Sequence, residues 1–188
     1  YFKPTMKEFY KDKIMKYEGF SNNVIQKSIS KLSAVNGRRK IIHTKDKGTY
    51  IIDYAHTAQS YEDIYKDFNT NKSVTTLFGC GGDRDNTKRE VTARIVDKYS
   101  SNIFITEDNS RTEKFTKIVK DILKGINKNT QYMIYESRKK ALRSLFLQSK
   151  SHDINFILGK GSESYIIRGK KKIKHNDINY IMDMIKKL

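Results

Sequence analysis

The feature that most constrains the fold is an alternation between short apolar runs and amphipathic stretches. Runs rich in β-branched and aromatic residues predict buried strands at residues 49–53, 74–78, 102–106, 132–135 and 154–158. Amphipathic stretches predict helices at about residues 60–68, 88–99, 113–123, 138–148 and 177–187. Strands joined by helices need right-handed crossovers, so the sequence predicts an α/β domain whose mostly parallel sheet is flanked by helices.

The first 36 residues follow a different pattern. They predict two amphipathic helices, at about residues 8–17 and 21–32, and no strand. The turn signal Asn36-Gly37-Arg38-Arg39 comes next. We therefore expect a boundary here, with residues 1–36 ending one domain and residues 37–188 forming another.

Composition narrows the class of protein. No apolar run approaches the roughly 18 residues that a membrane helix needs, and the first residues do not resemble a signal peptide. A single cysteine, Cys80, excludes an internal disulfide and fits a reducing compartment. We expect a cytoplasmic protein without a membrane partner.

The net charge of +17 raises the question of a nucleic-acid partner. Lys170, Lys171, Lys172 and Lys174 form one cluster, but the other lysines are spread along the chain. No motif that interleaves basic and aromatic residues stands out. We favour a solvated, lysine-rich surface, and the alternative predicts steeply salt-dependent binding of DNA or RNA.

Polar and glycine-rich strings follow the predicted strands. They are Asp53-Tyr54-Ala55-His56-Thr57, Phe78-Gly79-Cys80-Gly81-Gly82-Asp83-Arg84-Asp85, Asp108-Asn109-Ser110-Arg111, Ser137-Arg138 and Gly159-Lys160-Gly161-Ser162-Glu163. In an open α/β sheet, ligands bind beyond the carboxyl ends of the strands. The strings therefore predict a ligand site at that edge.

The second string is not a dinucleotide fingerprint, because Arg84 stands where that motif needs glycine. Arg84 instead suggests a fork for a carboxylate or phosphate, held by Asp83 or Asp85. The alternative is a tight turn with surface ion pairs. The third string is either a ligand loop or a capping loop, in which Ser110 or Thr112 caps the next helix.

The last string contains Gly159-Lys160-Gly161, but no G-x-x-x-x-G-K-[ST] phosphate loop occurs in the chain. Glu163 then places a carboxylate at the ligand edge, where it suits an ammonium group. His56 fits a general base, a residue that stacks on a base, or an ordinary loop residue. The four histidines are too scattered to predict a metal site, and no catalytic residue is assigned.

Taken in order, these strings resemble the C-terminal domain of the Mur ligases, in particular the UDP-N-acetylmuramoyl-tripeptide synthetases. The family pattern reads G-R, D-Y-A-H-T-P, F-G-C-G-G-D-R-D followed by K-R, D-N-P-R and G-K-G-H-E. It corresponds here to Gly37-Arg38, Asp53 to Ala58, Phe78 to Asp85 with Lys88-Arg89, Asp108 to Arg111, and Gly159 to Glu163. The resemblance runs from Gly37 to the C-terminus.

The resemblance implies a Rossmann-like domain of a bacterial ligase of peptidoglycan synthesis, a cell-wall pathway tied to cell shape and division. Such ligases have three domains, and residues 1–36 would be the tail of the central one. That domain would carry the ATP phosphate loop and most contacts to Mg²⁺, so this chain alone is expected to be inactive. ATP phosphorylates the carboxylate of a UDP-MurNAc-dipeptide, and the amine of an amino acid attacks the acyl phosphate.

The resemblance also implies site residues. Those for the amino acid are Arg84, Asp108, Asn109, Ser110, Arg111, Gly159 and Glu163. Those for the nucleotide are Arg38, Asp53 and His56. The arginines would face carboxylates and Glu163 an ammonium, and no metal ligand is implied in this chain.

Arg111 points to the substrate, because D-N-P-R goes with meso-diaminopimelate, whose distal carboxylate needs a cation. The expected reaction adds this amino acid to UDP-MurNAc-L-Ala-D-Glu. Four residues depart from the pattern: Ala58 and Ser110 replace prolines, Ser137 replaces an aspartate and Ser162 replaces a histidine. The alternatives are a ligase for lysine or another amino acid, and a non-catalytic binding module of the same fold.

Overall fold

The structure is a computed structural model that describes residues 19–24, 27, 38–68 and 73–188. Contacts divide the chain into two units, Tyr1–Val35 and Asn36–Leu188. In the first unit, residues 22–24 and 27 are helical; the rest of the helix predicted at 21–32, and the one at 8–17, lie outside the described residues. The assignment of residues 1–36 to a central domain stays a prediction.

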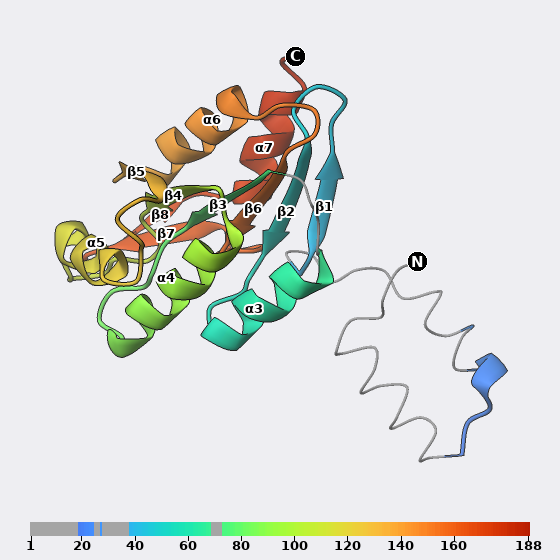
Figure 1. The fold of residues 1–188 in the computed structure, drawn as a ribbon, viewed down its shortest axis with the longest axis horizontal. Coiled ribbons are helices and arrows are strands. Elements are labelled where there is room, and N and C mark those ends of the chain that lie inside the picture. Colours follow the sequence, from blue (N-terminus) through green and yellow to red (C-terminus); the bar gives the residue numbers. More distant parts are fainter. Residues whose placement is uncertain (1–18, 25–26, 28–37, 69–72) are drawn as a thin grey trace. The chain divides into compact units, whose positions relative to one another are not determined.

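The second unit is built on a six-stranded sheet of order β1-β2-β6-β3-β4-β5 (Figure 1). The strands are β1 Lys40–His43, β2 Thr49–Asp53, β3 Val74–Phe78, β4 Asn102–Thr106, β5 Gln131–Tyr135 and β6 Ile154–Leu158. Only β1 among them runs antiparallel to its neighbour, and the other pairings are parallel. The predicted mostly parallel sheet is confirmed.

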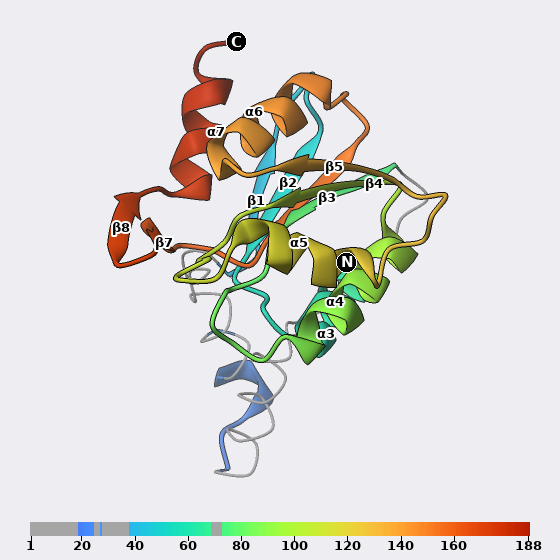
Figure 2. The same cartoon turned by 90° about the vertical axis from the view of Figure 1, so that its left-hand side faces the viewer.

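Helices cover both faces of the sheet (Figure 2). They are α3 Ala58–Asp67, α4 Thr87–Tyr99, α5 Phe115–Leu123, α6 Arg138–Gln148 and α7 Asp177–Ile185. Side chains cap three of them: Thr57 in a capping box, Ser137, and Asn176. No helix in the described part of the chain is long and apolar enough to cross a membrane.

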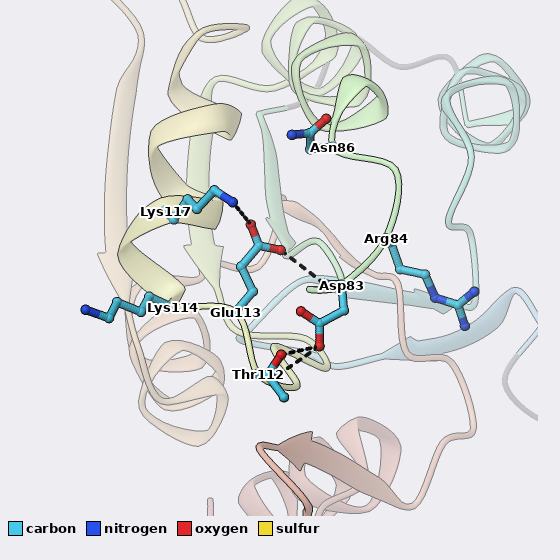
Figure 3. Close-up of a pocket in the computed structure, with 7 residues that line it drawn as sticks. All are labelled: Asp83, Arg84, Asn86, Thr112, Glu113, Lys114 and Lys117. Atoms are coloured by element: carbon cyan, nitrogen blue, oxygen red, sulfur yellow. Dashed lines mark hydrogen bonds and ion pairs between the residues drawn. The ribbon is translucent and has the colours of Figure 1, made fainter.

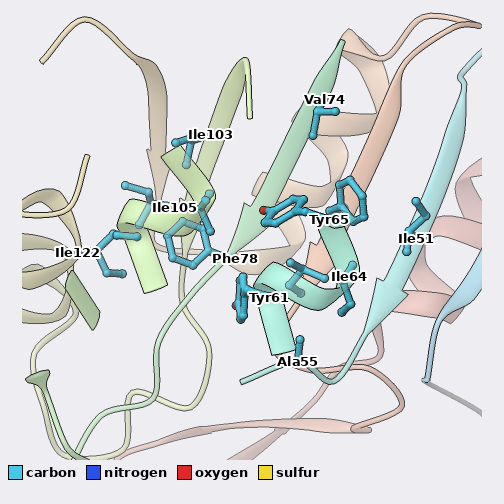
Figure 4. Packing of buried hydrophobic residues seen from close by; sticks show 14 of the residues in the cluster. Ile51, Ala55, Tyr61, Ile64, Tyr65, Val74, Phe78, Ile103, Ile105 and Ile122 are labelled. Atoms are coloured by element: carbon cyan, nitrogen blue, oxygen red, sulfur yellow. The ribbon is translucent and has the colours of Figure 1, made fainter. Parts of the chain in front are cut away.

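Alternation along the strands divides the core into two clusters, one on each face. Ile51 of β2 packs with α3, α4 and α5, whereas its neighbours Tyr50 and Ile52 pack with α6 and α7. Figure 4 shows the first cluster, in which Tyr61 of α3 lies beside Phe78 of β3, with ring centroids 6.2 Å apart. Side chains in a strand alternate with period two, so a strand buried on both faces is mostly apolar, although Thr76 of β3 and Asn155 of β6 are buried too.

Two features were not predicted. Strand β1 pairs with β2 as a hairpin across a turn at Gly48 (φ 74°), where a side chain would collide with the carbonyl of Asp153. A separate hairpin joins β7, Tyr165–Arg168, to β8, Lys171–Lys174. The capping prediction for α5 was wrong: its N-cap is Lys114, without a side-chain cap.

The parallel strands bring the carboxyl ends of β2, β3, β4 and β6 to one edge. Asp53 pairs with Leu158, and Phe78 pairs with Ile105 one residue before β4 ends. The polar strings therefore leave the sheet side by side, as the topology of an open α/β sheet requires.

Candidate functional site

The loop after β3 and the loop after β4 touch through their backbones. The N–H of Gly82 donates to the carbonyl of Asn109 at 2.8 Å. A Cβ at Gly82 would lie 1.9 Å from the carbonyl oxygen of Ser110, so only glycine permits this approach. A Cβ at the neighbouring Gly81 would lie 3.2 Å from Arg111 Nη1 and 3.7 Å from Arg84 Cγ, so the two arginines lie at the same part of the edge.

Four side chains form a polar cluster between the β4 and β6 loops. The ammonium of Lys160 lies 2.9 Å from Asp108 Oδ1, 3.2 Å from Asn109 Oδ1 and 2.5 Å from Glu163 Oε2. Asn109 Nδ2 donates to the same Glu163 oxygen at 3.1 Å. The structure therefore brings together Asp108, Asn109 and Glu163, which the sequence placed in one site, around a lysine that it did not.

Gly159 joins this cluster to the loop after β2. Its N–H donates to the carbonyl of Asp53 at 3.1 Å, and a Cβ on it would lie 3.6 Å from Asp108 Oδ2. Tyr54, next to Asp53, has its pKa raised by burial and by the negative charges of Glu163 and Asp108. The loops after β2, β4 and β6 thus meet around one negatively charged region.

Arg111 is held by backbone and side chain together. It has φ of 50°, and its N–H donates to the carbonyl of Ile167 in β7 at 3.1 Å. Its own carbonyl accepts from Gly169 N at 2.6 Å. The guanidinium donates through Nη1 to the carbonyls of Gly82, at 2.7 Å, and Asn109, at 3.3 Å. The β7–β8 hairpin is therefore what fixes this loop.

Arg84 lies on the rim of an open pocket of about 440 Å³ between the β3 loop and α5 (Figure 3). It is exposed and has no hydrogen bond or ion pair within the described residues. The prediction that Asp83 or Asp85 holds it was wrong: Asp83 accepts from the N–H and hydroxyl of Thr112, and Asp85 from those of Thr87. The guanidinium is left free for a ligand.

A buried ion cluster under this pocket was missed by sequence reasoning. Arg89 of α4 is 2% exposed and donates to both carboxylate oxygens of Glu113, at 2.9 and 2.6 Å, and to Asp121 at 3.0 Å. Its Nη2 also donates to the carbonyl of Gly81 at 3.0 Å. Hydrogen bonding to Arg89 lowers the pKa of Glu113 to about 2. The signal available was Arg89 itself, which lies five residues after Arg84 and belongs to the Lys88-Arg89 pair of the family pattern.

A second buried pair supports the site from below. Arg138, fully buried at the start of α6, binds Asp177 of α7 through Nε and Nη2, with a shortest distance of 2.7 Å. It also donates to the carbonyls of Glu107, at 3.3 Å, and Leu158, at 3.1 Å. These carbonyls directly precede Asp108 and Gly159, so one guanidinium ties together the ends of β4 and β6.

The residues predicted for a nucleotide gather around Tyr54. The guanidinium of Arg38 lies over its ring at 5.0 Å, and the ring of the exposed His56 is 5.1 Å away. Asp53 is buried and accepts from the N–H of Arg39 at 2.7 Å. Cationic and aromatic groups at a surface suit phosphates and a base.

The described residues contain neither an activated cysteine nor a cluster of metal ligands. Burial raises the pKa of Cys80 to about 12, so its thiol is not an activated nucleophile. The part of the chain that the structure describes holds no group of three His, Cys, Asp or Glu side chains placed to bind a metal ion.

Comparison with known proteins places this site in a family. Residues 37–161 match the model of the family described as "Mur ligase, glutamate ligase domain". The UDP-N-acetylmuramoyl-L-alanyl-D-glutamate--2,6-diaminopimelate ligase 1 of Clostridium acetobutylicum is 39% identical over 176 residues, which are 91% of this chain and 36% of that protein. The chain thus spans about a third of the length of this curated relative.

Solved structures agree with the fold. A structure of UDP-N-acetylmuramoyl-L-alanyl-D-glutamate--2,6-diaminopimelate ligase matches with a TM-score of 0.75 at 27% identity, over 92% of this chain and 36% of that one. E. coli FolC in complex with ADP matches with a TM-score of 0.67 at 15% identity, over 99% of this chain and 40% of that one. The latter likeness concerns the fold alone.

Proposed function

Because this chain belongs to the family of Mur ligase glutamate ligase domains, we propose that it is the C-terminal, amino-acid-binding domain of an ATP-dependent ligase. The full ligase adds meso-diaminopimelate to UDP-MurNAc-L-Ala-D-Glu in peptidoglycan synthesis, in the bacterial cytoplasm. The relative of 39% identity carries the name of this activity. Residues 1–36 then belong to the end of the central domain.

The observation that supports the proposal is that carboxylate and guanidinium side chains lie at the same edge of the sheet. Asp108 and Glu163 supply carboxylate oxygens for an ammonium, and Asn109 donates to Glu163, whereas Arg84 and Arg111 supply guanidinium groups for carboxylates. Arg111 uses only Nη1 in its bonds to Gly82 and Asn109, and a guanidinium carries five N–H donors. A diamino diacid presents both kinds of partner at each end.

The negative charge of Asp108 and Glu163 distinguishes the two amino groups of a bound diamino acid. An ammonium beside Asp108 and Glu163 is held in its protonated form, and a protonated amine has no lone pair with which to attack. The amine bound there is therefore the one that does not react. The other amine, at the far end of the molecule, points to the acyl phosphate and forms the amide bond.

The nucleotide face is proposed to lie on the loop after β2. Arg38 and His56 are exposed beside Tyr54, and Asp53 lies beneath them. FolC, which shares the fold, was solved in complex with ADP. The phosphate loop and the carboxylates for Mg²⁺ are assigned to the central domain, so ATP meets this domain only when the domains close.

The test is an NMR titration of the chain with meso-diaminopimelate, and with lysine as comparator. We expect shifts around Arg84, Arg111 and Glu163 with diaminopimelate, and their loss in Arg111→Ala. The matched control is Arg94→Ala on α4, an exposed arginine paired with Glu90, which should bind like the wild type. Shifts with lysine alone would refute the substrate, and shifts with neither ligand would refute amino-acid binding by this domain.

A further inference from the structure

Lys160 is a fully buried cation at the edge that carries the site. Its side chain is 0% exposed, and its ammonium contacts Asp108, Asn109 and Glu163. An ammonium has three N–H donors, and these three acceptors lie within 3.2 Å. No donor remains for a phosphate, so Lys160 does not act like the lysine of a phosphate loop.

The backbone turns this side chain inward. Gly159 and Gly161 on either side of Lys160 both have positive φ, at 103° and 52°, which glycine adopts without strain. The Lys160 carbonyl accepts from Glu163 N at 2.9 Å, so the same turn sets the separation of the two side chains. The Gly-Lys-Gly string is thus explained by an internal ion pair.

The cluster would carry two negative charges without the lysine. Asp108 and Glu163 both bind the one ammonium, at 2.9 and 2.5 Å, so Lys160 brings the charge of the group to −1. Asn109 links the two sides: its Nδ2 donates to Glu163, and its Oδ1 accepts from Lys160 and from the N–H of Ile167 at 2.8 Å. One oxygen of each carboxylate, Asp108 Oδ1 and Glu163 Oε2, is therefore fixed by Lys160, and Asn109 also binds the second.

We propose that Lys160 is a positioning residue that holds Asp108 and Glu163 together as a binding site for a single substrate ammonium. The proposal rests on the proposed function, because it assigns a role within the amino-acid site. Without Lys160, repulsion drives the two carboxylates apart and the preformed arrangement is lost. The lysine itself contacts the substrate only through these carboxylates.

Chemical rescue separates this role from simple packing. Lys160→Ala keeps Cβ and vacates three methylene groups and the ammonium. The charged n-propylammonium and the uncharged n-propanol both match this space. Lys160→Met keeps the volume and removes the charge. The affinity of the chain for meso-diaminopimelate is measured by NMR titration for each variant, with and without each additive, and the wild type with n-propylammonium controls for competition.

We expect both variants to bind at least about tenfold more weakly than the wild type, because bonds to charged groups are lost. The amine, but not the alcohol, should recover binding in Lys160→Ala. Unchanged binding in Lys160→Met, or equal recovery by the alcohol, would overturn the proposal.

Thermal unfolding of the free chain provides a measurement that needs no substrate. n-Propylammonium should raise the melting temperature of Lys160→Ala more than n-propanol does, and should leave that of the wild type unchanged. An equal effect of the two additives would overturn the counter-ion role. If the wild type fails to bind diaminopimelate, the proposed function fails and the positioning role fails with it, whereas weaker binding confined to the variants supports both.

Discussion

Replacement of Arg138 by methionine should be among the most destabilising single changes in the domain. The guanidinium and the Asp177 carboxylate are both 0% exposed, and Arg138 also satisfies the carbonyls of Glu107 and Leu158. Arg138→Met leaves a buried carboxylate whose remaining partner is His175, at 2.6 Å. Removing one member of a buried ion pair costs about 3–5 kcal/mol, because the other charge stays desolvated.

The assay is urea unfolding followed by circular dichroism, since the chain has no tryptophan. For a domain of this size the loss corresponds to a fall in melting temperature of about 6–20 °C. The matched control is Arg94→Met, whose pair with Glu90 is exposed, so we expect a change of about 0.5 kcal/mol or less.

A double variant makes the reasoning refutable. Arg138→Met with Asp177→Leu removes both charges, and apolar residues in place of a buried pair are often neutral or stabilising. The double variant should therefore be more stable than Arg138→Met alone. A loss below about 1 kcal/mol in Arg138→Met, or a double variant no better than the single one, would show that the pair is not the desolvated pair that the structure describes.

The effect should also depend on pH. Burial acts to raise the pKa of Asp177, but the charge of Arg138 and hydrogen bonds from His175 and Arg138 outweigh it, so the pKa lies below its usual range. A carboxyl with a lowered folded pKa stabilises the protein above its unfolded pKa, about 3.9, and loses this effect as pH falls through the folded pKa. Without Arg138, burial should raise the pKa of Asp177 above its unfolded value, so the deficit of Arg138→Met should be largest near neutral pH and shrink as pH falls through that raised pKa toward the wild-type one.

Three further changes test other parts of the site. Glu113 has a pKa of about 2 because of Arg89, against an ordinary value of 4.5, so the urea midpoint of Glu113→Gln should lie below that of the wild type at neutral pH and converge with it as pH falls from 4.5 toward 2. Gly82→Ala places a Cβ 1.9 Å from the carbonyl of Ser110 and should lower the free energy of unfolding by about 1–3 kcal/mol, measured with urea. Arg84→Ala should leave that free energy within about 0.5 kcal/mol but weaken binding of meso-diaminopimelate in an NMR titration, because Arg84 is exposed and unpaired among the described residues.

Each of these three predictions would be contradicted by a definite result. A constant difference between Glu113→Gln and the wild type across that pH range would contradict the ion pair with Arg89. Full stability in Gly82→Ala would mean that the two loops do not touch through their backbones. Undiminished binding in Arg84→Ala would remove Arg84 from the amino-acid site.

The sequence predicted the strands that are buried on both faces, because such strands are mostly apolar. The predicted burial of β5 was wrong, because Tyr132 and Ile134 of this edge strand are exposed. The sequence did not predict the short strands β1, β7 and β8, in which charged residues and a histidine dilute the apolar signal. Their pairing is set by the neighbouring strand. The hairpin that holds Arg111 therefore could not be predicted from its own composition.

For the site, the strings lie together at the carboxyl edge of the sheet, as the sequence predicted, but they did not predict which side chains pair. Arg84 and Asp83 are adjacent in sequence, yet Asp83 has φ of 53° and its carboxylate turns to Thr112, 29 residues away. Lys160 turns inward because of the φ angles of its flanking glycines. Such pairings depend on loop geometry and on contacts distant in sequence, neither of which a local pattern contains.

Ser110 shows how such contacts can replace a local restraint. The family pattern has proline here, and proline stiffens a loop chiefly by limiting the unfolded chain. In this domain, Asn109 O accepts from Gly82 N, and Arg111 bonds to β7 through its N–H and to Gly169 through its carbonyl. These three backbone bonds fix the residues on both sides of Ser110. We therefore expect Ser110→Pro to raise the free energy of unfolding by about 0.4–1 kcal/mol, while the backbone bonds already hold the Arg111 loop in place without the proline.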